Sequence, residues 1–485
     1  MPGGHSVRFM TEYDLIVIGA GPVGENVADR AVQSGLSAAI VERELVGGDC
    51  SYWACIPSKA LLRSGAVLRA AADVDGARQA VHGGVDAAAV LRRRDGMVHD
   101  WTDDGQVSWL EDARIDLVRG HGRLTGPRRV VVTAPDGTVT TLTARHAVAI
   151  STGSAAMLPE VPGLAGIRPW TSRDATSAHA VPDSLAIIGG GVVACEMATA
   201  YRDLGAQVTI VARSGLLSRL ESFAGELVRT ALEESGVTVL TDASVASASR
   251  DAAGRASLTL ADHRRVSAAA VLVATGRVPR TTDLGLESVG LDPGSWLDVD
   301  ETMLVGGTDW LYAVGDVNHR ALLTHQGKYQ ARAAGDVIAA RAQGSAVDDA
   351  PWGVHAATAD RAAVPQVVFA DPEVAAVGLT AAAAESAGMR VRVHDYDLAD
   401  VSGASEAADH YRGRARLVID DRRDVIVGAT FAGPDVAELL HAATIAVVGE
   451  VPLARLWHAV PAYPTVSEVW LRLLEADGRP HPTGR

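Results

Sequence analysis

The chain has 485 residues, with 44 basic and 59 acidic side chains and a formal net charge of -15. This charge argues against general nucleic-acid binding and against attachment to anionic lipid, because phosphate groups would be repelled. No apolar run approaches the roughly 20 residues of a membrane-spanning helix, and the first ten residues lack the apolar stretch of a secretory signal. We therefore expect a soluble, cytoplasmic protein of several domains.

The first predicted elements form a strand, a glycine turn and a helix. Residues 13–18 are apolar and β-branched, and Gly19-x-Gly21-x-x-Gly24 follows them directly. In this pattern the glycines allow a tight turn, a close approach of backbone N–H groups to a pyrophosphate, and close packing of helix on strand. Glu42, 18 residues after Gly24, ends the next strand and is placed to accept hydrogen bonds from an adenosine ribose. The alternative is a glycine turn without a ligand.

The same pattern recurs in the second third of the chain. The apolar strand 184–188 leads into Gly189-x-Gly191-x-x-Ala194, and a second strand covers residues 207–211. The segment between the two patterns is predicted to be helical at first and then rich in strands. The sequence therefore predicts two nucleotide-binding folds in one chain.

The second fold carries arginine where the first carries a carboxylate. No acidic residue follows the strand 207–211, whereas Arg213 and Arg219 do. A ribose 2′-hydroxyl favours a carboxylate at this place, and a 2′-phosphate favours arginine. We therefore predict NADPH in preference to NADH, the alternative being that both arginines are only solvated surface residues.

The strongest local signal is a pair of cysteines with four residues between them. Cys50 and Cys55 lie shortly after Glu42 in the sequence, and Lys59 follows them. Such a pair can close a small disulfide where the chain bends into a helix, and a nearby flavin can reduce it. The alternatives are two inert buried thiols or a zinc site, but zinc needs further ligands and the remaining cysteine, Cys195, lies in the second nucleotide-binding helix.

Together these motifs resemble the flavoprotein disulfide reductases, the group that holds dihydrolipoamide dehydrogenase, glutathione reductase and mercuric reductase. The resemblance covers nearly the whole chain, and four further segments carry it: residues 151–154, 274–279, 311–317 and 369–380. It implies an α/β fold with two Rossmann-like dinucleotide-binding domains and a C-terminal α+β dimerisation domain. The implied parts are an FAD-binding domain (1–157 and 286–357), an NADPH-binding domain (158–285) and an interface domain (358–485).

The resemblance also implies where FAD and NADPH bind. Glu42 is expected at the FAD ribose, Asp316 at the ribityl chain and Gly122 at a backbone contact. Lys59 is expected near flavin N5, paired with Glu196. The full set of implied cofactor contacts is Gly19, Gly21, Gly24, Glu42, Lys59, Gly122, Thr152, Gly153, Ser154, Gly189, Gly191, Ala194, Arg213, Arg219, Gly276, Asp316, Leu322, Leu323, Thr324 and His325.

By the same resemblance, hydride passes from NADPH to FAD, the flavin reduces the Cys50–Cys55 disulfide, and Cys50 attacks the substrate. The family usually ends in His-Pro-Thr-x-x-Glu, in which the histidine manages thiol protons. This chain retains the glutamate as Glu468 but has Tyr463 in place of the histidine. A phenol, with an ordinary pKa near 10, is a poor base at neutral pH. His458 is an alternative base.

We therefore predict a homodimeric, NADPH-dependent FAD oxidoreductase that reduces a disulfide or another small acceptor through Cys50 and Cys55. One alternative is a quinone or dye reductase that works directly from the flavin. Another is a mercuric-type metal-ion reductase, although no cysteine follows Cys195 that would deliver a metal ion. A third is a flavin-binding sensor or assembly subunit without turnover. We predict no resident metal site.

Overall fold

The computed structural model describes residues 11–479. The first ten residues, on which the signal-peptide prediction depends, and residues 480–485 lie outside the described part. The chain divides into two compact units. Unit 1 contains residues 11–55, 98–155 and 277–361, and unit 2 contains residues 56–97, 156–276 and 362–479.

Helices and strands alternate in the two nucleotide-binding folds, and a run of consecutive strands follows each of them. The helices are α1 (Pro22–Gln33), α2 (Gly48–Tyr52), α3 (Cys55–Ala72), α4 (Ala87–Met97), α5 (Asp104–Asp112), α6 (Ser172–Ser177), α7 (Val192–Asp203), α8 (Ser222–Glu234), α9 (Thr324–Ala342), α10 (Ala359–Ala362), α11 (Ala381–Ser386), α12 (Ser402–Ala407), α13 (Leu440–Val448), α14 (Leu453–Leu456) and α15 (Val469–Asp477). The strands are β1 (Glu12–Ile18), β2 (Ala38–Glu42), β3 (Asp116–Arg119), β4 (His121–Gly126), β5 (Arg129–Thr133), β6 (Val139–Ile150), β7 (Ser154–Ala156), β8 (Ser184–Ile188), β9 (Gln207–Val211), β10 (Thr238–Leu240), β11 (Val245–Arg250), β12 (Ala256–Leu260), β13 (Arg265–Ala268), β14 (Ala270–Val273), β15 (Arg277–Pro279), β16 (Leu311–Ala313), β17 (Pro365–Val368), β18 (Glu373–Gly378), β19 (Val391–Asp397), β20 (Arg414–Asp420) and β21 (Val425–Gly433).

Unit 1 is built on a sheet in the order β3-β2-β1-β6-β5-β4, with β16 paired to β6. Strands β1, β2, β3, β6 and β16 run parallel, and β4 and β5 form an antiparallel extension. Alternate side chains of β1 enter different cores: Leu15 and Val17 pack with α1 and α9 on one face, and Ile16 and Ile18 pack on the other. The predicted first nucleotide-binding fold is therefore present.

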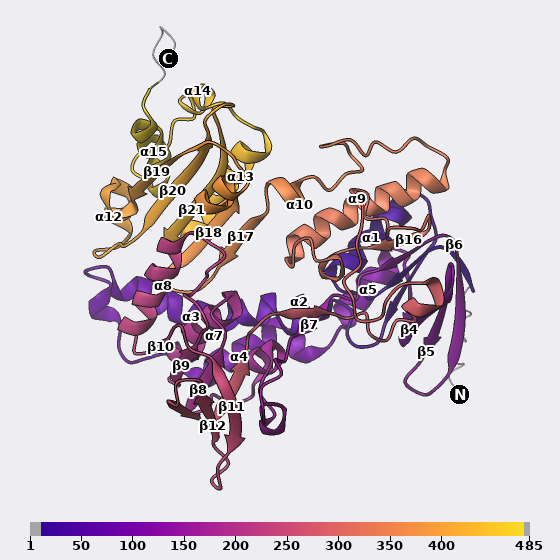
Figure 1. Ribbon diagram of the computed structural model, residues 1–485, viewed down its shortest axis with the longest axis horizontal. Helices are drawn as coiled ribbons and strands as arrows, with labels where there is room; N and C mark the ends of the chain where they lie inside the picture. Colours follow the sequence, from indigo (N-terminus) through magenta and orange to yellow (C-terminus); the bar gives the residue numbers. More distant parts are fainter. Residues whose placement is uncertain (1–10, 480–485) are drawn as a thin grey trace. The chain divides into compact units, whose positions relative to one another are not determined.

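Helices α1 and α9 lie side by side on that sheet face (Figure 1). Two glycines of α9 allow the close approach: a Cβ atom on Gly327 would come 2.5 Å from Val23, and one on Gly335 would come 2.5 Å from Arg30. The Arg30 guanidinium pairs with Asp336 at 2.7 Å. This packing fixes the start of α9 relative to the glycine turn of α1.

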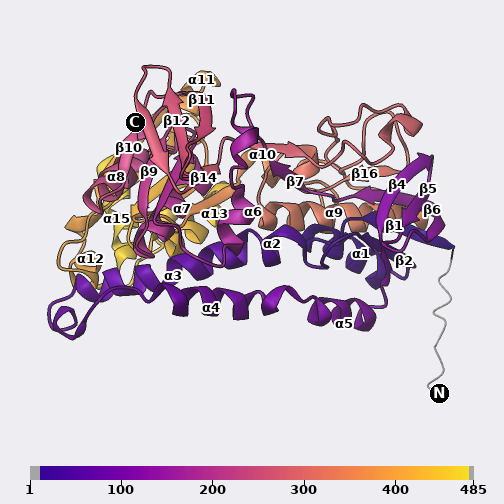
Figure 2. The same cartoon turned by 90° about the horizontal axis from the view of Figure 1, so that it is seen from below.

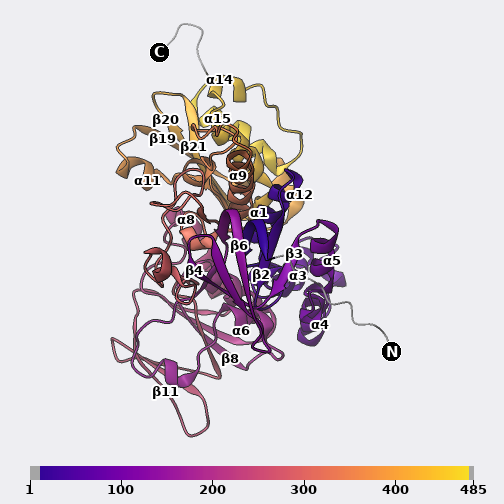
Figure 3. The ribbon, with the colours of Figure 1, turned by 90° about the vertical axis from the view of Figure 1, so that its right-hand side faces the viewer.

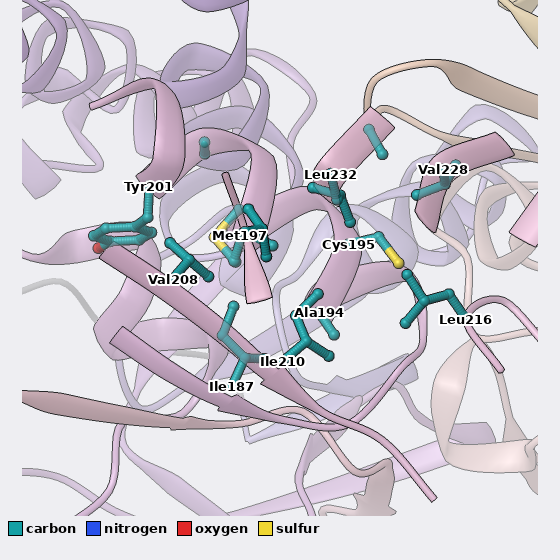
Figure 4. Close-up of a cluster of buried hydrophobic side chains, with 14 of the residues drawn as sticks. Ile187, Ala194, Cys195, Met197, Tyr201, Val208, Ile210, Leu216, Val228 and Leu232 are labelled. Atoms are coloured by element: carbon teal, nitrogen blue, oxygen red, sulfur yellow. The ribbon is translucent and has the colours of Figure 1, made fainter. Parts of the chain in front are cut away.

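Unit 2 contains the second nucleotide-binding fold. Its parallel sheet has the order β10-β9-β8-β14, and α7 packs on it through a fully apolar core. In Figure 4 the Cys195 side chain lies among the labelled members of this core. Burial raises the pKa of Cys195 to about 12. Cys195 therefore fills space between helix and sheet. On the other face of that sheet, β11, β12 and β13 add an antiparallel layer.

The C-terminal part of unit 2 is an antiparallel sheet in the order β17-β18-β21-β20-β19. Helix α13 packs on β18 and β21, and α15 packs on β19. Figure 3 shows α15 beside β19 and β20. Strands grouped with segregated helices form the α+β module that the sequence predicted. In residues 11–479 no helix is long and apolar enough to cross a membrane.

Residues 56–97 group with unit 2, although the predicted division includes them in the first FAD-binding segment. Helix α4 runs alongside α3 (Figure 2), and Leu61, Leu62 and Val90 enter the core of the second nucleotide-binding fold. Arg94 is fully buried and donates hydrogen bonds to the carbonyl oxygens of Thr176 and Ala178. Apolar contacts and a buried cation thus hold these helices. The predicted four-part division remains a prediction.

Replacing Arg94 should destabilise unit 2. Arg94→Met leaves two carbonyl acceptors without their charged donor, so we expect a loss of about 3 kcal/mol. Urea denaturation followed by circular dichroism checks this. Arg92→Met on the same helix, at an exposed position, is the matched control. Equal urea midpoints for the two variants would contradict the stabilising role of the buried Arg94 guanidinium.

Candidate active site

The first glycine turn has the shape that a pyrophosphate needs. Gly19 has φ +102°, and a Cβ atom on it would come 2.6 Å from the carbonyl oxygen of Ser151. A Cβ atom on Gly24 would come 2.0 Å from the Gly19 oxygen, so helix and strand require glycine at both positions. A Cβ on Gly21 would meet its nearest neighbour only at 4.0 Å, which leaves that backbone open to a ligand at the start of α1. The turn therefore fits a dinucleotide.

Glu42 stands at the end of β2, beside this turn. Its carboxylate accepts hydrogen bonds from the backbone N–H groups of Ala20 and Glu44, each at 2.8 Å. These bonds fix the carboxylate next to the glycine motif, where the sequence placed an acceptor for ribose. Gly122, in β4, packs against Val41, to which a Cβ atom on the glycine would come within 3.1 Å.

A second group of polar side chains surrounds Asp316. Ser154 donates a hydrogen bond to its carboxylate at 2.5 Å, and Arg277 donates to Ser154 at 2.5 Å. Arg280 donates to the Ser154 carbonyl oxygen at 2.9 Å and pairs with Asp49 at 3.2 Å. Burial raises the pKa of Asp316 above its ordinary value. Of the five residues, Ser154 and Asp316 were predicted, whereas Asp49 and the two arginines were missed.

The predicted loop 151–154 joins this group through its backbone. Thr152 donates from its hydroxyl to the carbonyl oxygen of Arg280 at 2.9 Å, and the N–H of Arg280 donates to Gly153 at 3.0 Å. Arg277 belongs to the predicted segment 274–279, and Asp49 directly precedes Cys50. Their positions inside two motifs were the signal that could have identified them.

The two cysteines lie at the junction of two helices, and both are thiols in the structure. Cys50 is in α2, Cys55 begins α3, and the Cys55 Sγ atom is 3.4 Å from the hydroxyl oxygen of Thr324. The hydrogen bond with Cys55, together with burial, raises the pKa of Cys50. Thr324 and the positive charge of Lys328 act on that pKa in the opposite direction. The start of α9 therefore opposes part of the increase in the pKa of Cys50.

Leu322, Leu323 and His325, the other predicted residues of this segment, flank Thr324. Leu322 and Leu323 are half-buried and lead into α9, and His325 is exposed in its first turn.

Lys59 and Glu196 form the ion pair that the sequence predicted. The ammonium group lies one helical turn after the start of α3 and is 2.8 Å from the carboxylate of Glu196, which is buried in α7. The same carboxylate accepts a hydrogen bond from the Phe369 N–H at 3.1 Å, and the ammonium lies 4.7 Å from the centre of the Phe369 ring. The Glu196 carboxylate and the Phe369 ring thus fix the position of the Lys59 ammonium group, and the Phe369 N–H fixes the carboxylate.

The second glycine turn repeats the geometry of the first. Gly189 has φ +132°, and a Cβ atom on it would come 2.3 Å from the Ala274 oxygen. Around a Cβ atom on Gly191 there is open space, which leaves room for a ligand at the start of α7. Ala194 is buried in the first turn of α7, and Gly276 accepts a hydrogen bond from the Met157 N–H at 2.9 Å.

Arg213 and Arg219 are carried by the loop after β9, and both are exposed. The N–H of Leu217, between them, donates to the Gly190 carbonyl oxygen at 2.8 Å. This bond ties the loop to the second glycine turn. Two guanidinium groups are therefore available next to a turn that fits a nucleotide.

The C-terminal residues do not form a proton-transfer pair within the described chain. Tyr463 is 76% exposed. Glu468 is buried, and its Oε2 atom has no hydrogen-bond partner in residues 11–479. His458 is exposed and lines a surface pocket with Pro452, Ala454 and Arg455.

Comparison with known proteins agrees with this geometry. The model of the family "pyridine nucleotide-disulphide oxidoreductase" matches residues 13–344, and that of its dimerisation domain matches residues 364–473. The chain belongs to the pyridine nucleotide-disulphide oxidoreductase family. Family membership confirms the predicted resemblance and makes the chain an oxidoreductase that binds FAD and a pyridine nucleotide.

Two relatives illustrate the range of this family. A dihydrolipoyl dehydrogenase of Chlorobaculum tepidum is 32% identical, covering 94% of this chain and 95% of the relative. A mercuric reductase of Acidithiobacillus ferrooxidans is 30% identical, covering 96% and 83%. In structure the chain matches the HOCl-induced flavoprotein disulfide reductase RclA of Escherichia coli in its Cu(II) complex, with a TM-score of 0.82, 22% identity and coverage of 96% and 99%. The structural match confirms the predicted fold.

Glu25, in the first turn of α1, is a buried carboxyl group that the sequence analysis did not identify. Its Oε1 atom has no hydrogen-bond partner within the described residues. Burial raises its pKa to about 7, the charge of Lys328 lowers it, and that of Glu42 raises it further. No pattern in the sequence distinguishes this glutamate from the solvated ones on other helices.

The raised pKa of Glu25 predicts a pH-dependent stability. The fold binds the proton more tightly than the unfolded chain does, so this contribution is complete below about pH 4.5 and is lost as the pH rises through 7. Relative to Glu25→Gln, the wild type should lose about 3 kcal/mol of unfolding free energy between pH 4 and pH 8. Urea denaturation at a series of pH values measures the difference. The matched control is Glu111→Gln, at an exposed position of unit 1, and a pH-independent difference would contradict the raised pKa.

Proposed function

We propose that the protein is an NADPH-dependent flavoprotein reductase in which Cys50 and Cys55 alternate between dithiol and disulfide and pass two electrons to a disulfide or another small acceptor. The observation that carries the proposal is the pair of thiols at the junction of α2 and α3, hydrogen-bonded to each other and close to Thr324. A protein that only bound a flavin would require no such pair.

FAD, when bound, supplies two-electron transfer between a reduced nicotinamide and a disulfide. The residues of this chain that we expect to hold it are the glycine turn of α1, Glu42 and the buried Asp316. Contacts with Glu196 and Phe369 fix the position of the Lys59 ammonium group. We expect its positive charge to stabilise negative charge that develops at the reacting centre.

With a disulfide acceptor, the atoms balance over two exchange steps. The Cys50 thiolate attacks one sulfur of the acceptor, which forms a mixed disulfide and releases the first thiolate. The Cys55 sulfur then attacks Cys50, closes the enzyme disulfide and releases the second thiolate. The two protons of the enzyme dithiol end on the two product thiols.

Proton transfer in these steps proceeds without the histidine that the family usually has. We propose that Tyr463 occupies its place and that Glu468 supports the proton transfer, although the two do not bond to each other in the described chain. His458 remains the alternative base. Because a phenol donates a hydrogen bond more readily than it accepts a proton, the arrangement favours an acceptor whose reduction needs little help from a base.

NADPH is the coenzyme that we propose for the second glycine turn. The loop that carries Arg213 and Arg219 is bonded to Gly190 through the Leu217 N–H, which supports the proposal that the two guanidinium groups bind a 2′-phosphate. We further propose a homodimer, because residues 364–473 match a dimerisation domain. A cytoplasmic location stays a prediction.

A metal ion is a second candidate substrate. The mercuric reductase relative is similar over nearly the whole chain, and two adjacent thiols are soft ligands that suit a soft metal ion. This candidate predicts that mercuric ion stimulates NADPH oxidation by the wild type and not by a variant that lacks Cys50.

Anaerobic titration with NADPH tests the leading proposal. After two electrons, the wild type should show the long-wavelength absorbance of a thiolate next to oxidised flavin, because the electrons rest on the cysteine pair. Cys55→Ser should instead show direct bleaching of the flavin, and Cys195→Ala, in the core of the second nucleotide-binding fold, should behave as the wild type. Bleaching of the wild type without that absorbance, with full quinone turnover in Cys55→Ser, would replace the proposal by a quinone reductase.

Removing one arginine of the nucleotide loop should reduce the preference for NADPH. Arg213→Ala loses a charge-assisted hydrogen bond of about 2 kcal/mol, so we expect the KM for NADPH to rise at least about tenfold. The KM for NADH should stay unchanged. The control is Arg229→Ala, an exposed arginine of α8 that pairs with Glu233. An equal rise in KM for both coenzymes would mean that Arg213 does not bind the 2′-phosphate.

A further inference from the structure

Five residues between α4 and α5 form a turn of unusual backbone conformation, which we call the strap (residues 99–103). His99, Asp100 and Trp101 have φ values of +50°, +50° and +56°. Left-handed backbone at successive non-glycine residues is unfavourable, because each Cβ atom crowds its own carbonyl group. Such a conformation persists only where surrounding contacts enforce it.

Two hydrogen bonds join the strap to the segment between the cysteines. The indole N–H of Trp101 donates to the carbonyl oxygen of Tyr52 at 3.2 Å. The Tyr52 hydroxyl donates in return to the carbonyl oxygen of Thr102 at 3.1 Å. Tyr52 is only 2% exposed, and burial raises its pKa to about 12, so the phenol remains a donor at neutral pH.

The other end of the strap holds the chain before the cysteines. The carboxylate of Asp103 accepts a hydrogen bond from the Val46 N–H at 2.7 Å and pairs with Arg119 at 2.5 Å. Arg119 also donates to the carbonyl oxygen of Glu44 at 2.8 Å. The strap thus holds both ends of residues 46–52, the segment that carries Cys50.

The bond to Tyr52 lies at the bend that sets the distance between the two sulfurs. Tyr52 is the last residue of α2, and Cys55 begins α3. The last carbonyl groups of a helix have no partner within the helix, and at Tyr52 the Trp101 indole supplies one. Fixing this carbonyl group fixes the direction in which the chain leaves α2 and therefore the position of Cys50 relative to Cys55.

We propose that the strap is a positioning element that sets the dithiol–disulfide equilibrium of Cys50 and Cys55. This inference rests on the proposed function, in which the pair alternates between the two states. The equilibrium is defined by exchange with glutathione: the enzyme dithiol and one glutathione disulfide give the enzyme disulfide and two molecules of reduced glutathione. Loosening the strap lowers the effective concentration of one thiol at the other and shifts this equilibrium toward the dithiol.

The exchange equilibrium of the holoenzyme in glutathione buffers provides the test. Samples are equilibrated without oxygen, quenched with acid and alkylated, and the two states are counted by mass spectrometry. Trp101→Phe removes the indole donor and keeps an aromatic ring. We expect its equilibrium constant for disulfide formation to fall about tenfold, which makes the reduction potential about 30 mV less negative. Trp109→Phe, in the neighbouring helix α5, is the matched control and should keep the wild-type value.

Variants at Asp100 separate the backbone from side-chain contacts. Asp100 is exposed, and both Asp100→Val and Asp100→Gly remove its charge. Only valine is incompatible with a φ of +50°, whereas glycine adopts it freely. We expect the valine variant to shift the equilibrium as Trp101→Phe does, and the glycine variant to stay within about twofold of the wild type.

The possible outcomes distinguish the two proposals. If the wild type forms no Cys50–Cys55 disulfide at any glutathione ratio, the proposed function fails. If it forms the disulfide but Trp101→Phe and Asp100→Val keep the wild-type equilibrium, the strap proposal alone is overturned. Equal shifts in the valine and glycine variants also overturn it, because the effect would then come from the lost charge.

Discussion

The close packing of α1 against its neighbours is the constraint on which unit 1 depends. Gly24 permits the contact with the preceding strand, because any larger residue would place its Cβ 2.0 Å from a carbonyl oxygen. Gly327 and Gly335 permit the contact with α9. The two contacts fix the helix start that carries Thr324, and Thr324 reaches Cys55. Glycines that do not contact either cysteine therefore determine which group of α9 lies beside the two sulfurs.

Two buried glutamates each have one carboxyl oxygen without a hydrogen-bond partner among the described residues, and the two cases differ. In unit 1 the pKa of Glu25 is raised to about 7, so its carboxyl group is protonated at lower pH. The protonated form is uncharged, which limits the free-energy cost of burying it. In unit 2 the Oε2 atom of Glu468 has no hydrogen-bond partner within residues 11–479, and by the family resemblance we expect a histidine where Tyr463 stands. A carboxyl oxygen without a partner is what we expect where tyrosine replaces a histidine that would bond to the glutamate.

The sequence predicted those features that depend on local patterns. The strand 207–211 is β9 in the structure with the same bounds, and both glycine turns open helices as expected. The pairing of Lys59 with Glu196 was reachable only through the family resemblance, because nothing in the spacing joins residues so far apart. The glycines of the two turns were recognisable from the sequence because the turn itself requires them. The distant residues that they contact were not recognisable.

What the sequence could not predict depends on contacts between distant segments. The buried Arg94 looks like any charged residue of an amphipathic helix, yet its guanidinium binds carbonyl groups more than 80 residues later. The contacts of Asp49 with the two arginines, and the strap itself, are of the same kind. No periodicity marks an indole that donates to one particular carbonyl group.

Two sets of groups act on the ionisation of the cysteine pair in opposite directions. A hydrogen bond between the two sulfurs keeps the proton on Cys50, and burial acts in the same direction. Against this, α9 presents Thr324 in its first turn and Lys328 one turn later on the same face, and the N-terminus of a helix itself favours negative charge. These groups favour the thiolate from within unit 1, without transferring a proton. Because the net effect on the pKa of Cys50 is an increase, Thr324 and Lys328 only reduce the tendency of the pair to stay protonated, and we expect its thiol protons to need an acceptor elsewhere.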